Sequence, residues 1–126
     1  MTSAMHTAEP KRILLVEDDA DSAEAMALLL QMQGYAVSRA ANGREALQRL
    51  NLEPQTSLII LDLYMPEMDG RTFLRIMRED PRFQTIPVIV VSAWAAASPA
   101  DVTAVMPKPV NVGLLLATVE RVLSNK

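Results

Sequence analysis

Cysteine is absent from this chain of 126 residues, and its only histidine is His6, near the amino terminus. The lack of cysteine rules out disulfides and thiolate metal sites. With a single histidine in an expected tail, catalysis by a histidine base is nearly excluded. Lysine and arginine number 12 against 15 acidic residues, a net charge of −3, so a basic surface that binds nucleic acid is not expected.

Long apolar segments are lacking as well. The longest, residues 25–30, is far too short to cross a bilayer, and residues 1–10 show no secretory signal. We therefore expect a cytoplasmic protein without membrane contact, in which residues 1–10 form a flexible tail and residues 11–126 form one domain. Half of the chain is hydrophobic, which is enough for an ordinary core.

The chain does contain an alternation of strand and helix patterns. Apolar runs predict buried strands at residues 12–17, 57–61 and 87–91, a weaker strand at 35–39 and a short one at 104–106. Residues 57–61 are the most apolar and are expected at the centre. Helical patterns between the strands indicate a parallel sheet with right-handed crossovers and helices on both faces.

Capping residues mark the expected helix starts. Asp19 or Asp21 begins a helix that ends near Gln33-Gly34, Asn42 begins a second, and Asn111 begins the last.

A third helix follows Asp69-Gly70 and ends near Asp80-Pro81. Its apolar residues are expected to face inward, while Arg71, Arg75 and Arg78 point outward. Gly70 is predicted to allow an unusual backbone angle at the helix start.

Polar residues follow the apolar runs where each predicted strand ends. Glu17 and Asp18 follow the first strand, Asp62 the third, Ser92 the fourth and Lys108 the last. Open α/β sheets bind ligands at the carboxyl ends of their strands, so one polar pocket is indicated. A carboxylate there is a candidate nucleophile or metal ligand.

Each of these residues also has an ordinary structural interpretation. Asp62 could be a turn residue, Lys108 a solvated lysine and Ser92 a strand-end cap. Acids at a helix start are common dipole partners, which explains Asp19 well but explains Glu17 and Asp18 poorly. The joint arrangement favours a site, because one sheet topology carries all of these residues to a single edge.

Five short motifs follow one another along the chain. They are ILLVEDD (13–19), ANGREAL (41–47), LDLYMPEMDG (61–70), PVIVVSA (87–93) and KP (108–109). In this order and at these separations they resemble the receiver domain of two-component response regulators, over about residues 11–124. The resemblance implies a flavodoxin-like, doubly wound α/β fold, with a five-stranded parallel sheet in the order 2-1-3-4-5.

The resemblance also implies a chemistry. Asp62 would be the phosphoacceptor, and Mg²⁺ the cofactor. Asp18, Asp62 and the backbone carbonyl of Tyr64 would bind Mg²⁺ directly, with Glu17 acting through water. Lys108 would pair with Asp62 and then with the phosphoryl group.

The Ser92 hydroxyl would hydrogen-bond a phosphoryl oxygen and move toward it. Lys108-Pro109 is a candidate for a cis peptide bond. The implied partners are a sensor histidine kinase or a histidine phosphotransfer protein, together with an unidentified downstream protein. The chain itself is expected to be no enzyme beyond promoting its own aspartyl phosphorylation and dephosphorylation.

The sequence departs from the family pattern in three places. These departures concern how phosphorylation would change the protein and how long the phosphoryl group would last. The segment from Ser92 to Lys108 is shorter than usual by roughly six residues, more than one helical turn, so the fourth helix of the family should be shortened, displaced or unwound. Val105 stands where the family has Tyr or Phe, and it either weakens the usual aromatic switch or simply fills space. Tyr64 and Trp94 border the pocket and could screen an acyl phosphate from water, although Trp94 could equally pack over a bare sheet edge.

Three functions compete. The first is a phosphorylation-controlled switch, which we expect to signal through protein contacts or onward phosphotransfer because no output domain follows Lys126. The start of the chain looks natural and favours a standalone protein over an excised domain. The second is a constitutive binding module that has lost the switch. It is favoured by the shortened segment and by Val105, and it is opposed by the complete set of Glu17, Asp18, Asp62, Ser92 and Lys108. The third is a Mg²⁺-dependent phosphohydrolase, which ranks last because Leu63 and Tyr64 supply no second acid after Asp62.

Overall fold

The computed structural model describes residues 10–65, 67–93 and 101–124. In chain order the elements are β1 (Arg12–Val16), α1 (Ala20–Met32), β2 (Ala36–Ala40), α2 (Gly43–Leu52), β3 (Leu58–Asp62), α3 (Gly70–Arg78), β4 (Val88–Ser92), β5 (Ala104–Pro107) and α4 (Val112–Ser124). The five strands and four helices expected from the patterns are present, and the strand bounds differ from the predicted ones by at most one residue.

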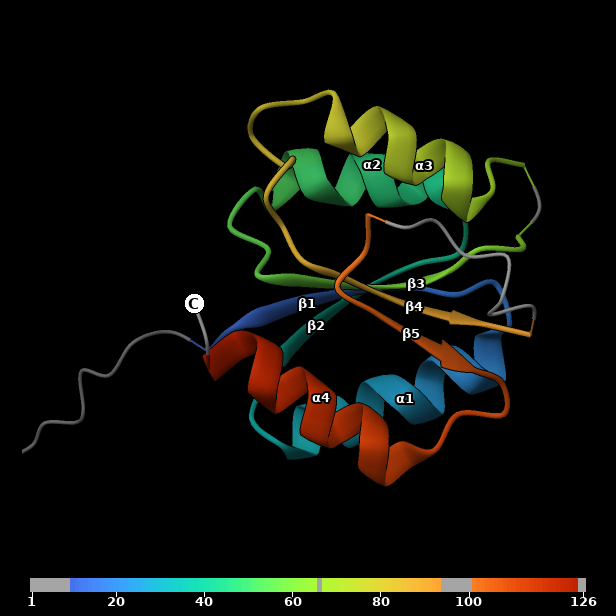
Figure 1. Cartoon of the computed structure of the whole chain (residues 1–126), viewed down its shortest axis with the longest axis vertical. Helices are drawn as coiled ribbons and strands as arrows, with labels where there is room; N and C mark the ends of the chain where they lie inside the picture. Colours follow the sequence, from blue (N-terminus) through green and yellow to red (C-terminus); the bar gives the residue numbers. More distant parts are fainter. Residues whose placement is uncertain (1–9, 66, 94–100, 125–126) are drawn as a thin grey trace, which may run out of the picture.

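The five strands form one parallel sheet in the order β2-β1-β3-β4-β5. Helices α2 and α3 cover one face of the sheet, and α1 and α4 cover the other (Figure 1). This arrangement confirms the doubly wound, flavodoxin-like fold. β3 lies at the centre and is buried along its whole length, as its apolar run predicted.

Each face of the sheet has its own hydrophobic core, because successive side chains of a strand point to opposite faces. In β1, Leu14 and Val16 join the core under α2 and α3. Ile13 and Leu15 join the core under α1 and α4. Both faces of the sheet are therefore covered by hydrophobic cores. A polar site can form only where the sheet is not covered, such as at the ends of its strands.

Four N-caps begin the four helices. The cap side chain accepts a hydrogen bond from the backbone N–H three residues later at Asp19, Asn42, Asp69 and Asn111. These contacts confirm the predicted helix starts, and they settle the choice for α1 in favour of Asp19. Gly34 follows α1 with a φ of 97°, as expected of a residue that terminates a helix.

One prediction about α3 was wrong. Arg71 and Arg75 are exposed as expected, but Arg78 folds back against the protein and its side chain is only 22% exposed. Its guanidinium donates hydrogen bonds to three backbone carbonyls, those of Gln84, Ile86 and Asp101. The Ile86 carbonyl is part-buried and needs a donor, which Arg78 supplies at a place that helix periodicity could not indicate.

The connection between β4 and β5 contains no helix in its described residues, 93 and 101–103. This agrees with the expectation of a shortened or unwound fourth helix. Residues 94–100 lie outside the described part of the chain, so the predictions about Trp94 are not tested. Val105 is 38% exposed, and its alternative role of filling the space left by the shortened helix stays a prediction.

The predicted tail, residues 1–10, lies almost wholly outside the described residues. Among the helices of the described ranges, none combines the length and the apolar character needed to cross a bilayer.

Candidate functional site

The predicted polar residues meet at the carboxyl edge of the sheet. Glu17 follows β1 directly, Asp62 and Ser92 end β3 and β4, and Lys108 follows β5. The register aligns these ends, since Ser92 pairs with Pro107, the residue before Lys108. The Lys108 N–H also donates to the Ser92 carbonyl oxygen at 3.1 Å. Parallel pairing thus places the four chain segments around one pocket.

Lys108 bridges two buried carboxylates. Its Nζ lies 3.1 Å from Asp62 Oδ2 and 3.0 Å from Glu17 Oε1. Asp62 and Glu17 are only 5% and 7% exposed. The pair with Asp62 was expected, but the pair with Glu17 was missed, because β1 and β5 are not neighbours in the sheet and no sequence spacing points to it.

The second oxygen of each carboxylate accepts a backbone N–H. Asp62 Oδ1 accepts from Tyr64 N at 3.2 Å, and Glu17 Oε2 accepts from Asp19 N at 3.0 Å. Both carboxylates are therefore held by one ammonium and one backbone amide. The hydrogen bond from the Tyr64 N–H also holds the Tyr64 backbone beside the Asp62 carboxylate. The Tyr64 carbonyl as a metal ligand stays a prediction.

The electrostatics of the pocket show a surplus of negative charge. Burial is the main cause that raises the pKa of Glu17 above its usual 4.5, and the charge of Asp62 adds to it, although hydrogen bonds from Asp19 and Lys108 oppose the shift. Burial acts to lower the pKa of Lys108, but its hydrogen bonds to Glu17 and Asp62 outweigh this and raise it. The raised pKa of Lys108 shows that the two carboxylates stabilise a positive charge at this position.

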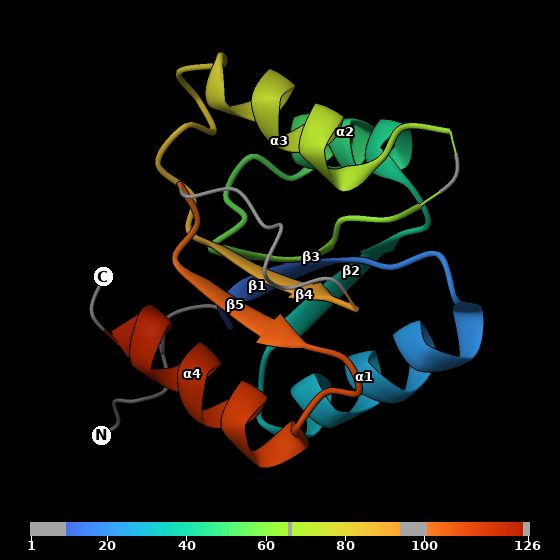
Figure 2. The same cartoon turned by 45° about the vertical axis from the view of Figure 1, so that its right-hand side comes forward.

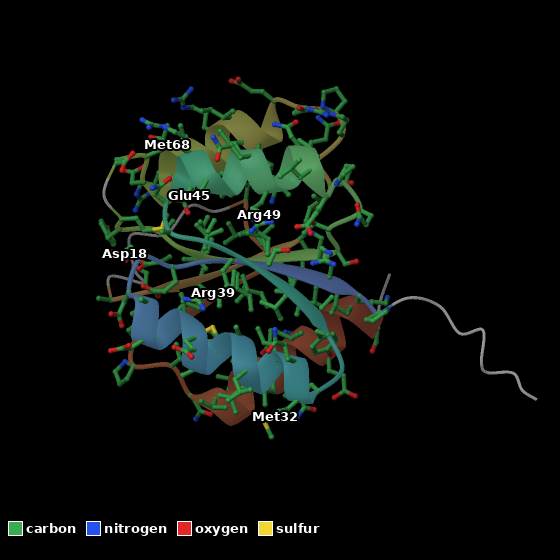
Figure 3. All side chains as sticks on the ribbon, turned by 180° about the vertical axis from the view of Figure 1, so that it is seen from behind. Asp18, Met32, Arg39, Glu45, Arg49 and Met68 are labelled. Atoms are coloured by element: carbon green, nitrogen blue, oxygen red, sulfur yellow. The ribbon has the colours of Figure 1, made fainter. Side chains whose placement is uncertain are left out.

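The donor set fits a hard divalent cation. One carboxylate oxygen from each of Glu17, Asp18 and Asp62 lies within 4.8 Å of the others. Asp18 is exposed, and Figure 3 shows it at the same end of the sheet as Met68, where solvent reaches the cluster. Carboxylates with room for several waters suit Mg²⁺ better than a softer metal.

Gly70 supports the site by close packing. A β-carbon at this position would lie 2.5 Å from the Asp62 carbonyl oxygen and 2.8 Å from Leu63 Cα. The Gly70 N–H also donates to the Leu63 carbonyl at 2.9 Å. Gly70 does not have a positive φ, so the prediction of an unusual backbone angle was wrong, and the glycine is required by space.

The loop after Asp62 is held from a second side by α2. The Gly43 N–H donates to the Met68 carbonyl at 2.8 Å, and a β-carbon on Gly43 would lie 2.8 Å from Met68 Cγ. The sequence pattern predicted only a helix start at Asn42, the residue before Gly43. The loop that carries the pocket is thus packed against the first residues of both α2 and α3.

The remaining predicted residues have these positions. Ser92 is fully buried at the end of β4. Tyr64 is 48% exposed. The peptide bond between Lys108 and Pro109 is cis, as predicted.

Comparison with known proteins agrees with this geometry. The sequence model of the response regulator receiver domain matches residues 13–120. The polar-differentiation response regulator DivK of Brucella anthropi is 30% identical over 122 residues, which cover 92% of this chain and 98% of DivK. A crystal structure of a response regulator receiver protein from Pseudomonas putida has a TM-score of 0.83 at 30% identity, covering 91% of this chain and 99% of that one.

Other relatives extend beyond the matched region. The response regulator Rre1 of Synechocystis is 40% identical over 87 residues, which cover 68% of this chain but 37% of Rre1. This chain therefore matches little more than a third of that protein's length. Since the family match covers residues 13–120, which include every residue of the pocket, the chain belongs to the response regulator receiver domain family.

Proposed function

We propose that this protein accepts a phosphoryl group on Asp62 and signals through changed contacts with other proteins. The observation that carries the proposal is the state of Asp62: a carboxylate 5% exposed, 3.1 Å from Lys108 Nζ, in a three-carboxylate cluster. The interpretation of Asp62 as an ordinary turn residue does not explain why two further acids lie beside it. A phosphoacceptor needs such surroundings, because the cation they bind and the lysine together offset the phosphoryl charge.

The proposed donor is the phosphohistidine of a sensor histidine kinase or of a phosphotransfer protein, or a small acyl phosphate. A carboxylate oxygen of Asp62 forms the bond to phosphorus. The bond from phosphorus to the donor atom breaks, and its electron pair stays on the donor. Lys108 then pairs with phosphoryl oxygens, and the Ser92 hydroxyl donates to one of them.

Glu17, Asp18, Asp62 and the Tyr64 carbonyl would hold Mg²⁺ in this proposal. The chemistry that a bound Mg²⁺ supplies there is neutralisation of charge on the phosphoryl oxygens. The chain turns over no separate substrate, and promotes only its own phosphorylation and dephosphorylation. Because histidine kinases draw their phosphoryl groups from ATP, we place the exchange in the cytoplasm.

One experiment tests the proposal directly. The protein is incubated with Mg²⁺ and acetyl phosphate, and its intact mass is measured. We expect a phosphoryl adduct that is absent without Mg²⁺ and absent in Asp62→Asn. Asp69→Asn is the matched control: it removes an acid from the same loop, while asparagine still caps α3, and it should keep the adduct.

The alternative is a constitutive binding module with the receiver fold and no working switch. The exposed Val105 favours it, because no aromatic ring stands there to report a change at Ser92. Beryllofluoride and Mg²⁺ should change Trp94 fluorescence if the switch works. An adduct without any such spectral or structural response would favour the binding module, and turnover of an added phosphoester would favour a hydrolase.

A further inference from the structure

The loop between β3 and α3, residues 63–69, contains an unusual backbone conformation. Within the described ranges, Glu67 is the one residue other than glycine with a positive φ, 62°. Residues with a side chain mostly avoid this left-handed region, and glutamate lacks the short polar side chain that lets asparagine and aspartate adopt it more readily. Such a conformation persists only where the surrounding structure imposes it, and residues of this kind cluster at functional sites. The neighbours of Glu67 must therefore hold the loop in this shape.

The first two residues of α2 contact the loop at this point. The Gly43 N–H donates to the Met68 carbonyl oxygen at 2.8 Å, and a β-carbon on Gly43 would lie 2.8 Å from that same oxygen. Arg44 Nη1 lies 3.2 Å from Glu67 Oε1. In Figure 2 the yellow-green loop passes the start of α2 on its way from β3 to α3. Two consecutive residues of α2 thus hold two consecutive residues of the loop.

The same loop reaches the pocket at its other end. Tyr64 lies three residues before Glu67, and its N–H donates to Asp62 Oδ1 at 3.2 Å. The Gly70 N–H closes the loop by donating to the Leu63 carbonyl at 2.9 Å. Because the loop is fixed at both ends, a change of direction at Glu67 has to be absorbed by the few residues between it and Tyr64. The conformation of Glu67 is therefore linked to the backbone that lies beside Asp62.

Folding stability does not explain a glutamate at this position. Glycine would adopt a φ of 62° without steric strain. The ion pair with Arg44 adds little stability, because the two side chains are 66% and 53% exposed and water screens their charges. A residue that disagrees with its local backbone conformation is expected where that conformation serves a function.

We propose that Glu67 is a positioning residue for the Mg²⁺ site and acts through the backbone of Tyr64. The inference rests on the function proposed for Asp62, because it concerns the same pocket and the predicted metal ligand at the Tyr64 carbonyl. The left-handed backbone of Glu67 fixes the direction of the loop, and Gly43 and Arg44 hold it there. The Glu67 carboxylate is not one of the three in the cluster and pairs with Arg44 instead.

The charges of Arg44 and Glu67 alone predict a different behaviour. Removal of a positive charge near a cation site strengthens cation binding, so a purely electrostatic role predicts tighter Mg²⁺ binding in Arg44→Gln. A positioning role predicts weaker binding, because the substitution loosens the loop. The sign of the change in Arg44→Gln therefore separates the two explanations.

The test measures the Mg²⁺ affinity of the full chain by calorimetric titration, and the stability of the metal-free protein by urea unfolding. In Glu67→Gly we expect a urea midpoint no lower than that of the parent, because glycine accepts the left-handed conformation. Its Mg²⁺ affinity should be about fivefold weaker, the equivalent of ordering the backbone of one residue on binding. Arg44→Gln should bind Mg²⁺ about twofold more weakly, in line with the loss of a screened ion pair.

The metal-free protein and a matched variant provide the controls. Amide exchange without Mg²⁺ should be faster at Tyr64 and Gly70 in both variants, since the hydrogen bonds of these two amides hold the ends of the loop. Arg49→Gln removes an exposed arginine from the last turn of the same helix as Arg44. It should leave both the Mg²⁺ affinity and the exchange rates unchanged.

Tighter or unchanged binding in Arg44→Gln, or parent-like affinity in Glu67→Gly, would overturn the proposal. A parallel loss of stability and affinity in Glu67→Gly would also overturn it, since it would show a purely structural role. A parent that binds no Mg²⁺ overturns it as well. If the affinities follow the expected pattern but acetyl phosphate gives no adduct, the function proposed for Asp62 fails while the positioning role of Glu67 stands.

Discussion

The Cα atom of Gly70 packs against the backbone of Asp62 so closely that a β-carbon there would lie 2.5 Å from the Asp62 carbonyl oxygen. The first residue of α3 and the last residue of β3 therefore share a contact that admits no side chain. The neighbour is backbone, so it cannot move aside by a change of rotamer. The position of the central carboxylate thus depends on a residue with no polar side chain of its own.

Gly70→Ala should destabilise the protein by about 1–3 kcal/mol, because overpacking forces the backbone near Asp62 to shift. It should also slow adduct formation from acetyl phosphate. Urea unfolding and intact mass measure the two effects. Gly113→Ala is the control: its β-carbon would meet nothing closer than Asn111 Oδ1 at 3.6 Å, so a helical alanine there should stabilise by about 0.5–1 kcal/mol. Equal effects of the two substitutions would contradict the packing argument.

Lys108→Met should destabilise the metal-free protein, because it leaves the buried Glu17 and Asp62 without a cation. We expect a loss of about 1–3 kcal/mol in urea unfolding. The lower part of that range is favoured because the Lys108 side chain is 33% exposed and partly screened. Millimolar Mg²⁺ should restore more stability to Lys108→Met than it adds to the parent. A loss that Mg²⁺ does not reduce would argue against a shared electrostatic cause.

Mg²⁺ affinity should fall as the pH is lowered toward the raised pKa of Glu17. A carboxyl group must lose its proton to assist a cation, so Mg²⁺ binding releases a proton in this range. The folding stability of the metal-free protein depends on pH in the opposite direction. The folded state binds the Glu17 proton more readily than the unfolded chain does. The contribution of Glu17 to stability therefore rises as the pH falls through its folded pKa toward 4.5. Calorimetric titration at several pH values measures the affinity, and Glu17→Gln should flatten its pH dependence.

Arg78→Met should cost about 1 kcal/mol, because the part-buried Ile86 carbonyl loses its donor, while the exposed carbonyls of Gln84 and Asp101 can bind water instead. Arg75→Met, on the same helix, should change the free energy of unfolding by no more than about 0.5 kcal/mol. Amide exchange should show faster opening around Ile86 and Asp101 only in the first variant. Similar stability of both variants would show that Arg78 does not anchor the connection to β5.

Truncation of Tyr64 and Trp94 to alanine should shorten the lifetime of the phosphoryl group on Asp62. The reason is access of water to the acyl phosphate, since bulky side chains at these positions can screen it. Phosphoryl loss after removal of acetyl phosphate, followed by mass, measures the lifetime. Leu52→Ala, an exposed side chain on α2, is the control. A lifetime that hardly changes in the double variant would refute the screening idea.

The order of strands and helices, the caps at Asp19, Asn42 and Asp69, and the candidates Asp62, Ser92 and Lys108 could all be predicted from the sequence. These features depend on local patterns: the period of apolar residues, the chemistry of a helix start, and a polar residue after an apolar run. The parallel topology then brings the strand ends to one edge. That is why the pocket was predictable before any contact was known.

The tertiary structure alone decided three other features. Lys108 pairs with Glu17 because both reach across the strands that separate β1 and β5. Gly70 is required by contact with Asp62 and not by its own φ, and Arg78 turns inward to donate to carbonyls of two other segments. Each depends on distances between segments remote in the chain, set by register and close packing, which no local pattern of residues encodes.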